Sequence, residues 1–253
     1  MNSLIHPYYR HGKNEINEMI DNFANDGEVF VKGKRNVIKR FAFETTTLNI
    51  KSFKIPNPVN AVVYRFFRKT KARRSFEYAN YLIQNGFGTP KPVAYFENFS
   101  PFLRDSYYVS EHLVADLMFR DLTTNPDYPD HENILRQFTR FSYALHQKGI
   151  EFKDHSPGNT LIKKAGDGKY EFFLVDLNRM DFHKTMSLEL RMKNLSRLTP
   201  KREMLIIMSN EYAKVSGHPE KLVSDTLIRL TENFQRKFHR KKRLKNKFLP
   251  GRK

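Results

Sequence analysis

The spacing of apolar residues divides the chain into a strand-rich first part and a helix-rich second part. After Gly27, β-branched and aromatic residues come in short runs separated by turn residues, which is typical of antiparallel strands. Helical spacing appears over Ala72–Leu82, where apolar residues can line one face. We therefore predict a small sheet of about five strands with one principal helix. The strand-like runs are Glu28–Lys32, Asn36–Phe41, Thr46–Phe53, Val93–Phe96 and Ser106–Glu111.

The second part of the chain is mostly helical. From about His131 to Lys148, apolar residues recur at the spacing of a helix that packs one face on a core. Further helices are expected near Arg191–Leu195, Lys201–Lys214 and Glu220–Phe238. The first 26 residues are polar and mixed, with a weakly helical segment around Glu15–Phe23. The whole pattern predicts an α+β protein with a small antiparallel-sheet lobe and a mainly helical lobe.

A loop and a hairpin interrupt the helical part and carry most of the candidate chemistry. Asp154-His155-Ser156-Pro157-Gly158-Asn159 follows the long helix, and a turn at Ala165–Gly168 separates two strands before Asp176. A carboxylate, an amide oxygen and a second carboxylate brought together in this way can bind magnesium and position a hydroxyl for phosphoryl transfer. Asp and Asn are also common turn formers. Their order here matches the parts of a kinase site, so the pattern favours a kinase-type phosphotransferase.

Composition and charge narrow the class of protein. The chain has 253 residues, a formal net charge of +18 and no cysteine. The charge favours an anionic partner, and the missing cysteines exclude disulfides, thiolate catalysis and cysteine-ligated metals. There is no secretory-type apolar run and no stretch near the roughly 20 apolar residues that cross a bilayer. We expect a cytoplasmic protein that is not integral to a membrane.

Four segments of the chain are similar to segments of known kinases: the Asp-x-x-Pro-Gly-Asn form of 154–159, Ala72–Ala79, Gly86–Pro92 and Asn194–Leu198. Through the first, the chain resembles the protein-kinase-like superfamily, and through the other three it resembles, more narrowly, the lipopolysaccharide kinase (Kdo/WaaP-type) family. The resemblance spans roughly Gly27 to Phe234 and implies a two-lobed protein-kinase-like fold. It implies an N-terminal extension over 1–26, an ATP-binding N-lobe over 27–111, a C-lobe over 112–235 and a basic tail over 236–253.

The resemblance also implies the cofactors and the central residues. ATP and Mg²⁺ would be used, with Asp154 orienting or deprotonating the acceptor hydroxyl. Asn159 and Asp176 would hold magnesium on the ATP phosphates. Glu111 and Leu113 belong to the connector between the lobes, which would offer backbone groups to adenine.

A lysine on the third strand and a glutamate on the next helix should grip the phosphates in such a site. Lys51 and Lys39 both lie in β-like runs, and the position of Lys51 in the meander favours it. Glu77 is the matching acid, because Arg65–Arg74 contains none. An exposed partner within its own helix is the alternative role for Glu77.

Several departures from the protein-kinase pattern shape the expected function. There is no Gly-x-Gly-x-x-Gly loop, Phe152 stands where a histidine usually lies, and Asp176-Leu177-Asn178 replaces Asp-Phe-Gly. These departures leave a pseudokinase open as an alternative. No Ala-Pro-Glu segment follows, which argues against a protein substrate. His146, His155 and His183 are not spaced like a metal site, and we interpret them as structural.

Two basic regions bear on partners. Arg65–Arg74 is rich in cations and free of acids, and Arg236–Lys253 carries ten Lys or Arg residues and no acid. Either region can be an ordinary solvated surface. As functional surfaces, they suit lipid A and core phosphates or an anionic membrane, at about 1 kcal/mol per cation. An RNA-binding tail would look similar, but without a nucleic-acid module we expect no specific nucleic acid.

The sequence thus favours an ATP-dependent kinase acting on a sugar hydroxyl of a lipopolysaccharide precursor. The acceptor would be Kdo or heptose, on Kdo-lipid A or the inner core, at the cytoplasmic face of the inner membrane. A kinase for a small soluble acceptor of the aminoglycoside or choline type is the first alternative. A pseudokinase that binds anionic lipid or RNA is the second.

Overall fold

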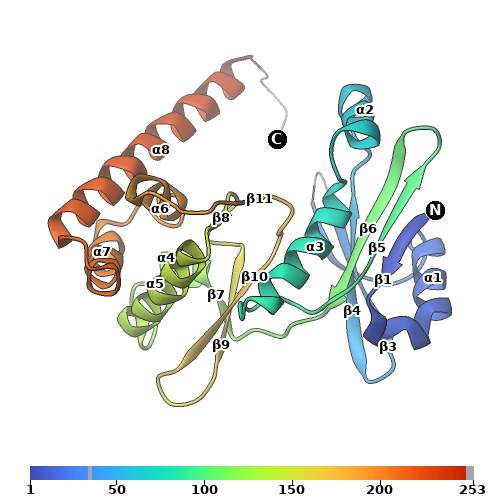
Figure 1. Ribbon diagram of the computed structural model, residues 1–253, viewed down its shortest axis with the longest axis horizontal. Coiled ribbons are helices and arrows are strands. Elements are labelled where there is room, and N and C mark those ends of the chain that lie inside the picture. Colours follow the sequence, from blue (N-terminus) through green and yellow to red (C-terminus); the bar gives the residue numbers. More distant parts are fainter. Residues whose placement is uncertain (34–35, 249–253) are drawn as a thin grey trace. The chain divides into compact units, whose positions relative to one another are not determined.

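The computed structural model describes residues 1–33 and 36–248, and it contains two compact units (Figure 1). The first unit comprises Met1–Val114 and Phe173–Arg179, and the second comprises Ala115–Phe172 and the chain from Met180 onward. One unit is built on an antiparallel sheet and the other is mainly helical. The α+β class predicted from the spacing of apolar residues is therefore confirmed.

A six-stranded antiparallel sheet forms the centre of the first unit, in the order β1-β5-β6-β4-β3-β2. All five runs that the sequence predicts are strands. The sixth strand, β1, lies in the N-terminal segment for which only a weak helix was expected, and it pairs with β5 so that Asn2 stands opposite Glu97. The strands are β1 (Asn2–Ile5), β2 (Glu28–Lys32), β3 (Asn36–Phe43), β4 (Thr46–Phe53), β5 (Pro92–Phe99) and β6 (Leu103–Glu111).

Helices cover both faces of this sheet. On one face, α1 buries Ile16 and Ile20 against Leu48 and Ile50 of β4. On the other face, α3 packs Phe76 against Tyr95 of β5, with the ring centroids 5.5 Å apart. The helical elements of the unit are η1 (Pro7–Gly12), α1 (Lys13–Asp21), α2 (Pro58–Phe66) and α3 (Lys71–Gln84).

The second unit is organised around α5, which packs on α7, and α7 in turn packs on α8. Its core is one continuous apolar cluster that includes Phe119, Phe138 and Tyr212. Its helices are α4 (Phe119–Thr124), α5 (His131–Gln147), α6 (Leu188–Leu195), α7 (Arg202–Ser216) and α8 (Glu220–Phe248). The sequence predicts four of these and misses α4. It also ends the last helix at Phe238, whereas α8 continues to Phe248.

Short strands position the loops of the second unit. A sheet has the order β10-β9-β7, and β8 pairs antiparallel with β11. The strands are β7 (Leu117–Met118), β8 (Ile150–Phe152), β9 (Thr160–Lys164), β10 (Tyr170–Leu174) and β11 (Met180–Phe182). The predicted hairpin is β9 and β10, and the last two residues of β10 belong to the first unit.

The basic tail expected over 236–253 is helical as far as Phe248, and its last five residues lie outside the described residues. Its side chains from Arg236 to Leu244 are largely exposed. Within the described ranges, no helix combines the length and the hydropathy of a membrane span.

Candidate functional site

Lys51 lies on β4, on the face of the sheet that α3 covers. Alternate residues of a strand face opposite sides. Leu48 and Ile50 point into the core under α1, whereas Phe53, in phase with Lys51, packs beside α3. The Nζ atom of Lys51 donates a hydrogen bond to Oδ1 of Asp176 at 2.8 Å. The structure therefore brings two of the predicted site residues together.

Lys39, the other candidate lysine, faces the opposite side of the sheet. It stands across from Ile50 in the pairing of β3 with β4, and it is 8% exposed. Its Nζ donates to the backbone oxygens of Phe23, Ala24 and Asp26 at 2.6, 3.2 and 2.7 Å. Three carbonyl partners satisfy all three donors of an ammonium group. Lys39 therefore stabilises the turn after α1, and the geometry favours Lys51 as the site lysine.

Asp176 is held in an unusual backbone conformation just after β10. Its φ of +61° lies in the left-handed region, which non-glycine residues rarely adopt and which often marks functional positions. Asn178 Nδ2 donates to the same Oδ1 atom at 2.6 Å that accepts from Lys51. The departure from Asp-Phe-Gly thus has a structural role, because Asn178 orients the carboxylate. Upstream, Thr89 Oγ1 donates to the Leu174 carbonyl at 2.8 Å and anchors the strand end.

Glu77 contacts cations of its own segment, and its expected role at the phosphates stays a prediction. In the described structure its carboxylate bonds Lys69 Nζ at 2.8 and 3.0 Å and Arg73 Nε at 2.9 Å. Partial burial acts to raise the pKa of Glu77. The hydrogen bonds and positive charges of Lys69 and Arg73 outweigh this effect and lower the pKa overall. The alternative considered for this residue, a partner within its own helix, is the observed arrangement for Arg73. Lysine 51 instead bonds the carboxylate of Asp176.

The connector residues end the sheet at β6. The N–H groups of Glu111 and His112 donate to the carbonyls of Lys91 and Thr47 at 2.9 and 2.7 Å. Because those two donors are used, Leu113 is the connector residue left for an adenine contact through its N–H, and that role stays a prediction. The Glu111 side chain accepts a hydrogen bond from the Tyr9 hydroxyl at 2.6 Å. Burial, followed by this hydrogen bond, raises the pKa of Tyr9.

The loop that carries Asp154 and Asn159 is a compact turn in the second unit. Ser156 N donates to the Asp154 carbonyl at 2.7 Å, and Asn159 N donates to the Ser156 carbonyl at 2.9 Å. The Asn159 side chain donates from Nδ2 to the same Asp154 carbonyl at 2.8 Å. This bond fixes the orientation of the amide, so Oδ1 is the atom that Asn159 can present to a cation.

Asn194 near the end of α6 (Leu188–Leu195) and Arg197 in the turn after it contact the residues on both sides of Asp154. Asn194 Nδ2 donates to the Phe152 carbonyl at 2.7 Å, and Arg197 Nη1 donates to the Lys153 carbonyl at 2.5 Å. On the other side, Asn194 Oδ1 lies 3.3 Å from His155 Nδ1. Sequence reasoning used Asn194–Leu198 only as a mark of resemblance and assigned it no role. The structure shows that two of its residues bond the backbone immediately before Asp154.

Two histidines complete this buried network. Asn194 Oδ1 also lies 3.1 Å from His146 Nε2, and His146 Nδ1 lies 3.0 Å from the Tyr212 hydroxyl. Since Nδ2 of Asn194 is the donor to Phe152, Oδ1 must accept, and both histidines must donate to it as neutral tautomers. Burial lowers the pKa of His146 to about 3 and that of His155 to about 4. Both rings are neutral at physiological pH, as expected for structural histidines.

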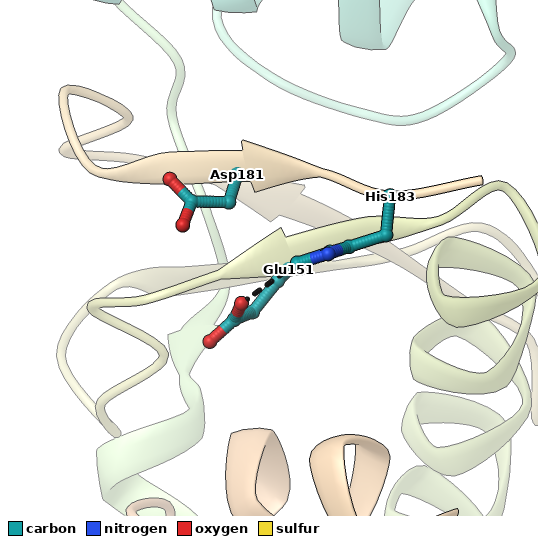
Figure 2. A group of neighbouring side chains, drawn as sticks. All are labelled: Glu151, Asp181 and His183. Carbon is teal, nitrogen blue, oxygen red and sulfur yellow. Dashed lines mark hydrogen bonds and ion pairs between the residues drawn. The ribbon is translucent and has the colours of Figure 1, made fainter. Parts of the chain in front are cut away.

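Figure 2 shows a second polar group in the same unit, formed by Glu151 on β8, Asp181 on β11 and His183 just after β11. Their ligand atoms lie within 4.8 Å of one another, close enough for one metal ion. However, His183 Nε2 bonds Glu151 Oε2 at 2.9 Å, and Asp181 forms an ion pair with Lys153. Each of the two carboxylates therefore has a hydrogen-bond or ion-pair partner within the protein. We interpret the group as a brace between β8 and β11.

Glycine 149 sets the distance between these two strands. The His183 N–H donates to the Gly149 carbonyl at 2.8 Å. Residue 149 has a φ of +69°, and a Cβ atom there would lie 1.8 Å from the His183 carbonyl oxygen. Only glycine allows the two backbones this close, immediately before the strand that leads to Asp154.

The side chains of the two units have the chemistry that a magnesium–nucleotide complex requires. Asp176 offers a carboxylate and Asn159 an oriented amide oxygen, which are the hard oxygen ligands that Mg²⁺ prefers. Lys51 offers an ammonium group next to Asp176. Each of these side chains, taken within its own unit, is of a type that binds metal or phosphate, and the role of each stays a prediction.

Comparisons with known proteins identify a family and solved structures with a similar fold. The sequence profile of the lipopolysaccharide kinase (Kdo/WaaP) family matches residues 59–216, which is more than half of the chain. The structure of WaaP in complex with acyl carrier protein is similar, with a TM-score of 0.65 and 17% identity over 95% of this chain and 99% of that one. A crystal structure of WbdD has a TM-score of 0.47 and 17% identity over 79% of this chain and 43% of that one. No curated protein sequence matches the chain significantly.

Proposed function

Because the chain belongs to the lipopolysaccharide kinase (Kdo/WaaP) family, we propose that it phosphorylates a sugar hydroxyl of lipopolysaccharide, using ATP and Mg²⁺. The acceptor would be a Kdo or heptose residue of the inner core, carried on a lipid-A-containing precursor. The observation that carries the proposal is the hydrogen bond of 2.8 Å between Lys51 and Asp176, with Asp176 in a left-handed conformation and oriented by Asn178. A partly buried lysine–aspartate pair, with the aspartate in a left-handed conformation, suits phosphate and metal binding better than it suits stability.

Each residue has a defined part in the proposed reaction. Lys51 would neutralise charge on the phosphates, and Asp176 with Asn159 Oδ1 would hold magnesium. Asp154 would accept the proton of the sugar hydroxyl, or orient that hydroxyl towards the phosphorus atom. Magnesium bound to the phosphates supplies charge neutralisation as the bond to the leaving oxygen weakens. Phosphoryl transfer depends mainly on positioning and electrostatics, and side chains of these types can supply both.

The hydrogen bonds of the catalytic loop support the role of Asp154. Its backbone carbonyl accepts from Ser156 N and from Asn159 Nδ2, and Asn194 and Arg197 bond the carbonyls of the two preceding residues. A loop fixed at four points limits the conformations available to Asp154. That restriction is what a residue needs in order to orient an acceptor hydroxyl.

The proposed place of action is the cytoplasmic face of the inner membrane. A lipid-linked acceptor lies in the membrane, and the chain has a formal net charge of +18. Such a charge attracts the protein to anionic lipid and to a phosphorylated acceptor.

A panel of acceptors tests the proposal. Phosphate transfer from labelled ATP is measured with Kdo-lipid A, with a heptose-containing core acceptor, and with a soluble aminoglycoside and choline. We expect magnesium-dependent labelling of one of the two lipopolysaccharide acceptors and none of the soluble amines. Labelling of a soluble amine alone would favour the small-acceptor alternative. Nucleotide binding without transfer to any acceptor would favour a pseudokinase.

A further inference from the structure

Helix α2 and the residue after it expose neighbouring aromatic side chains. Phe66 is 68% exposed and Phe67 is 81% exposed, with their ring centroids 6.4 Å apart. Val62, one turn earlier on the helix, is also exposed. Single exposed apolar residues are common, but a contiguous group of large ones marks an interaction surface.

The turn between β5 and β6 extends this apolar area. Arg65 places its guanidinium 5.3 Å from the centroid of the Phe99 ring at the end of β5. Helix α2 also packs against β6 (Figure 1). Phe102, in the turn itself, is 43% exposed. We call Val62, Arg65, Phe66, Phe67, Arg68 and Phe102 the α2 surface.

The charge around the α2 surface is positive. From Lys51 to Phe76 the chain has eight Lys or Arg residues and no acid, and Arg65 and Arg68 are exposed on the surface itself. The acids on neighbouring elements do not offset these cations. Glu97 is buried against Thr70, and Glu77 is bonded to cations. The other acids of the β5–β6 pair are the half-buried Asp105 and Glu111, and Glu111 accepts a hydrogen bond from Tyr9 and pairs with Lys91.

We propose that the α2 surface binds an anionic lipid bilayer, with Phe66 and Phe67 entering the headgroup region and Arg65 and Arg68 pairing with lipid phosphates. This combination of exposed aromatic rings and flanking cations on a short helix is the pattern of interfacial membrane binding. The inference rests on the proposed function, because a lipid-linked acceptor lies in a bilayer. It adds the docking element and assigns it to the unit that carries Lys51 and Asp176.

Vesicle sedimentation of the full chain tests this surface. Binding is measured without nucleotide, on vesicles of phosphatidylcholine mixed with phosphatidylglycerol and on vesicles of phosphatidylcholine alone. We expect Phe66→Ser/Phe67→Ser to weaken binding to the mixed vesicles by about tenfold or more. Arg65→Gln/Arg68→Gln should weaken it by about fivefold per cation, and only where anionic lipid is present.

A matched control is Tyr8→Ser, which removes an aromatic ring that is 72% exposed in η1 of the same unit. Binding should be unchanged in this variant. Equal binding of the Phe66→Ser/Phe67→Ser variant and the wild type would overturn the proposal. So would a wild type that binds neither kind of vesicle, which would leave an acidic protein as the partner of this surface.

The phosphotransfer assay separates this proposal from the proposed function. Phe66, Phe67 and Tyr8 do not belong to the proposed catalytic machinery, so the Phe66→Ser/Phe67→Ser and Tyr8→Ser variants should transfer phosphate normally to an acceptor dispersed in detergent. A wild type that binds vesicles through the phenylalanines but phosphorylates no lipopolysaccharide acceptor would support the surface and reject the kinase activity. If the wild type transfers phosphate normally in detergent but its vesicle binding does not depend on the phenylalanines, the kinase activity would be supported and the α2 surface rejected.

Discussion

At the scale of single residues, Asn194 determines the arrangement of the catalytic loop. One amide donates to the Phe152 carbonyl and accepts from His146 and His155, so it binds the strand before Asp154 and the residue after it. Amide and carboxylate side chains have nearly the same shape, but only the amide can donate to Phe152. We therefore propose that Asn194 positions the loop around Asp154 through the hydrogen bonds of its amide, and not only through its volume.

Substitution of Asn194 should lower kcat and leave KM for ATP nearly unchanged. We expect Asn194→Ala and Asn194→Asp both to reduce kcat by about tenfold to a hundredfold, because misplacement of a reacting group has effects of this size. Steady-state kinetics with thermal melting of each variant measures the effect. Asn80→Ala is the control, since Asn80 Nδ2 also donates to a backbone carbonyl, that of Phe76 in α3. Full activity of Asn194→Asp would contradict the role of the amide.

The buried histidines predict acid sensitivity of the fold. Burial lowers the pKa of His146 to about 3 and that of His155 to about 4, whereas unfolded histidine titrates near pH 6.5. Below about pH 6.5 the unfolded chain therefore binds more protons than the native chain, and the free energy of unfolding falls by up to about 1.4 kcal/mol per pH unit per histidine. This loss continues until the native rings protonate, near pH 4 and pH 3.

Urea unfolding as a function of pH measures this slope. His155→Phe keeps a ring between Phe138 and Phe152 and removes one titrating group, so the slope between about pH 6.5 and pH 5 should fall to roughly half. Substitution of the exposed His218 by Phe is the control and should leave the slope unchanged. An unaltered slope in the His155→Phe variant would show that this ring does not stay neutral in the native state.

Sequence reasoning identified some of these residues and missed others for definable reasons. Asp154, Asn159 and Asp176 stand out because their order along a loop and hairpin is itself the signal. The choice between Lys51 and Lys39 depends on which face of the sheet each occupies, and the strand register supplies that. For Glu77, the sequence shows that it is the first acid after a cation-rich segment, but only the structure shows which cations it contacts, and its role at the phosphates stays a prediction.

At the scale of elements, the regular strands and long amphipathic helices were predictable, and the short elements were not. The five runs of β2 to β6 and the helix α5 have the periodicity of their structures. β1, β8 and β11 have four, three and three residues, too few to show alternation. They exist because a partner strand satisfies their backbone groups, which is a property of the tertiary structure.

Helix α3 depends on Thr70 at its N-terminus. Thr70 Oγ1 accepts from Arg73 N at 3.2 Å and donates to the buried Glu97 carboxylate at 2.5 Å. Thr70→Val keeps the shape and removes both bonds, so it should lower the free energy of unfolding by about 1 to 3 kcal/mol. Thr70→Ser keeps the hydroxyl and should cost much less in urea unfolding. Equal stability of the two variants would reject the role of the cap.

At the scale of the whole molecule, positive charge is spread over both units. The end of α8 carries exposed cations and the exposed Phe238, in the unit that does not contain α2. Deleting residues 236–253 should weaken binding to anionic vesicles steeply at low salt and much less at high salt, because charge interactions are screened. Comparison with the Phe66→Ser/Phe67→Ser variant measures how much the tail and the α2 surface each contribute to vesicle binding. Unchanged binding after the deletion would reject a membrane role for the tail.

The central claim is that Asp154 and Asp176 serve one phosphoryl transfer. The most direct measurement is incorporation of labelled phosphate from ATP into Kdo-lipid A by the wild type, Asp154→Asn and Asp176→Asn, with nucleotide binding measured in parallel. We predict that each variant loses most of the incorporation, that Asp176→Asn also binds magnesium–ATP more weakly, and that Asp154→Asn still binds it. Incorporation that survives both substitutions would contradict the account.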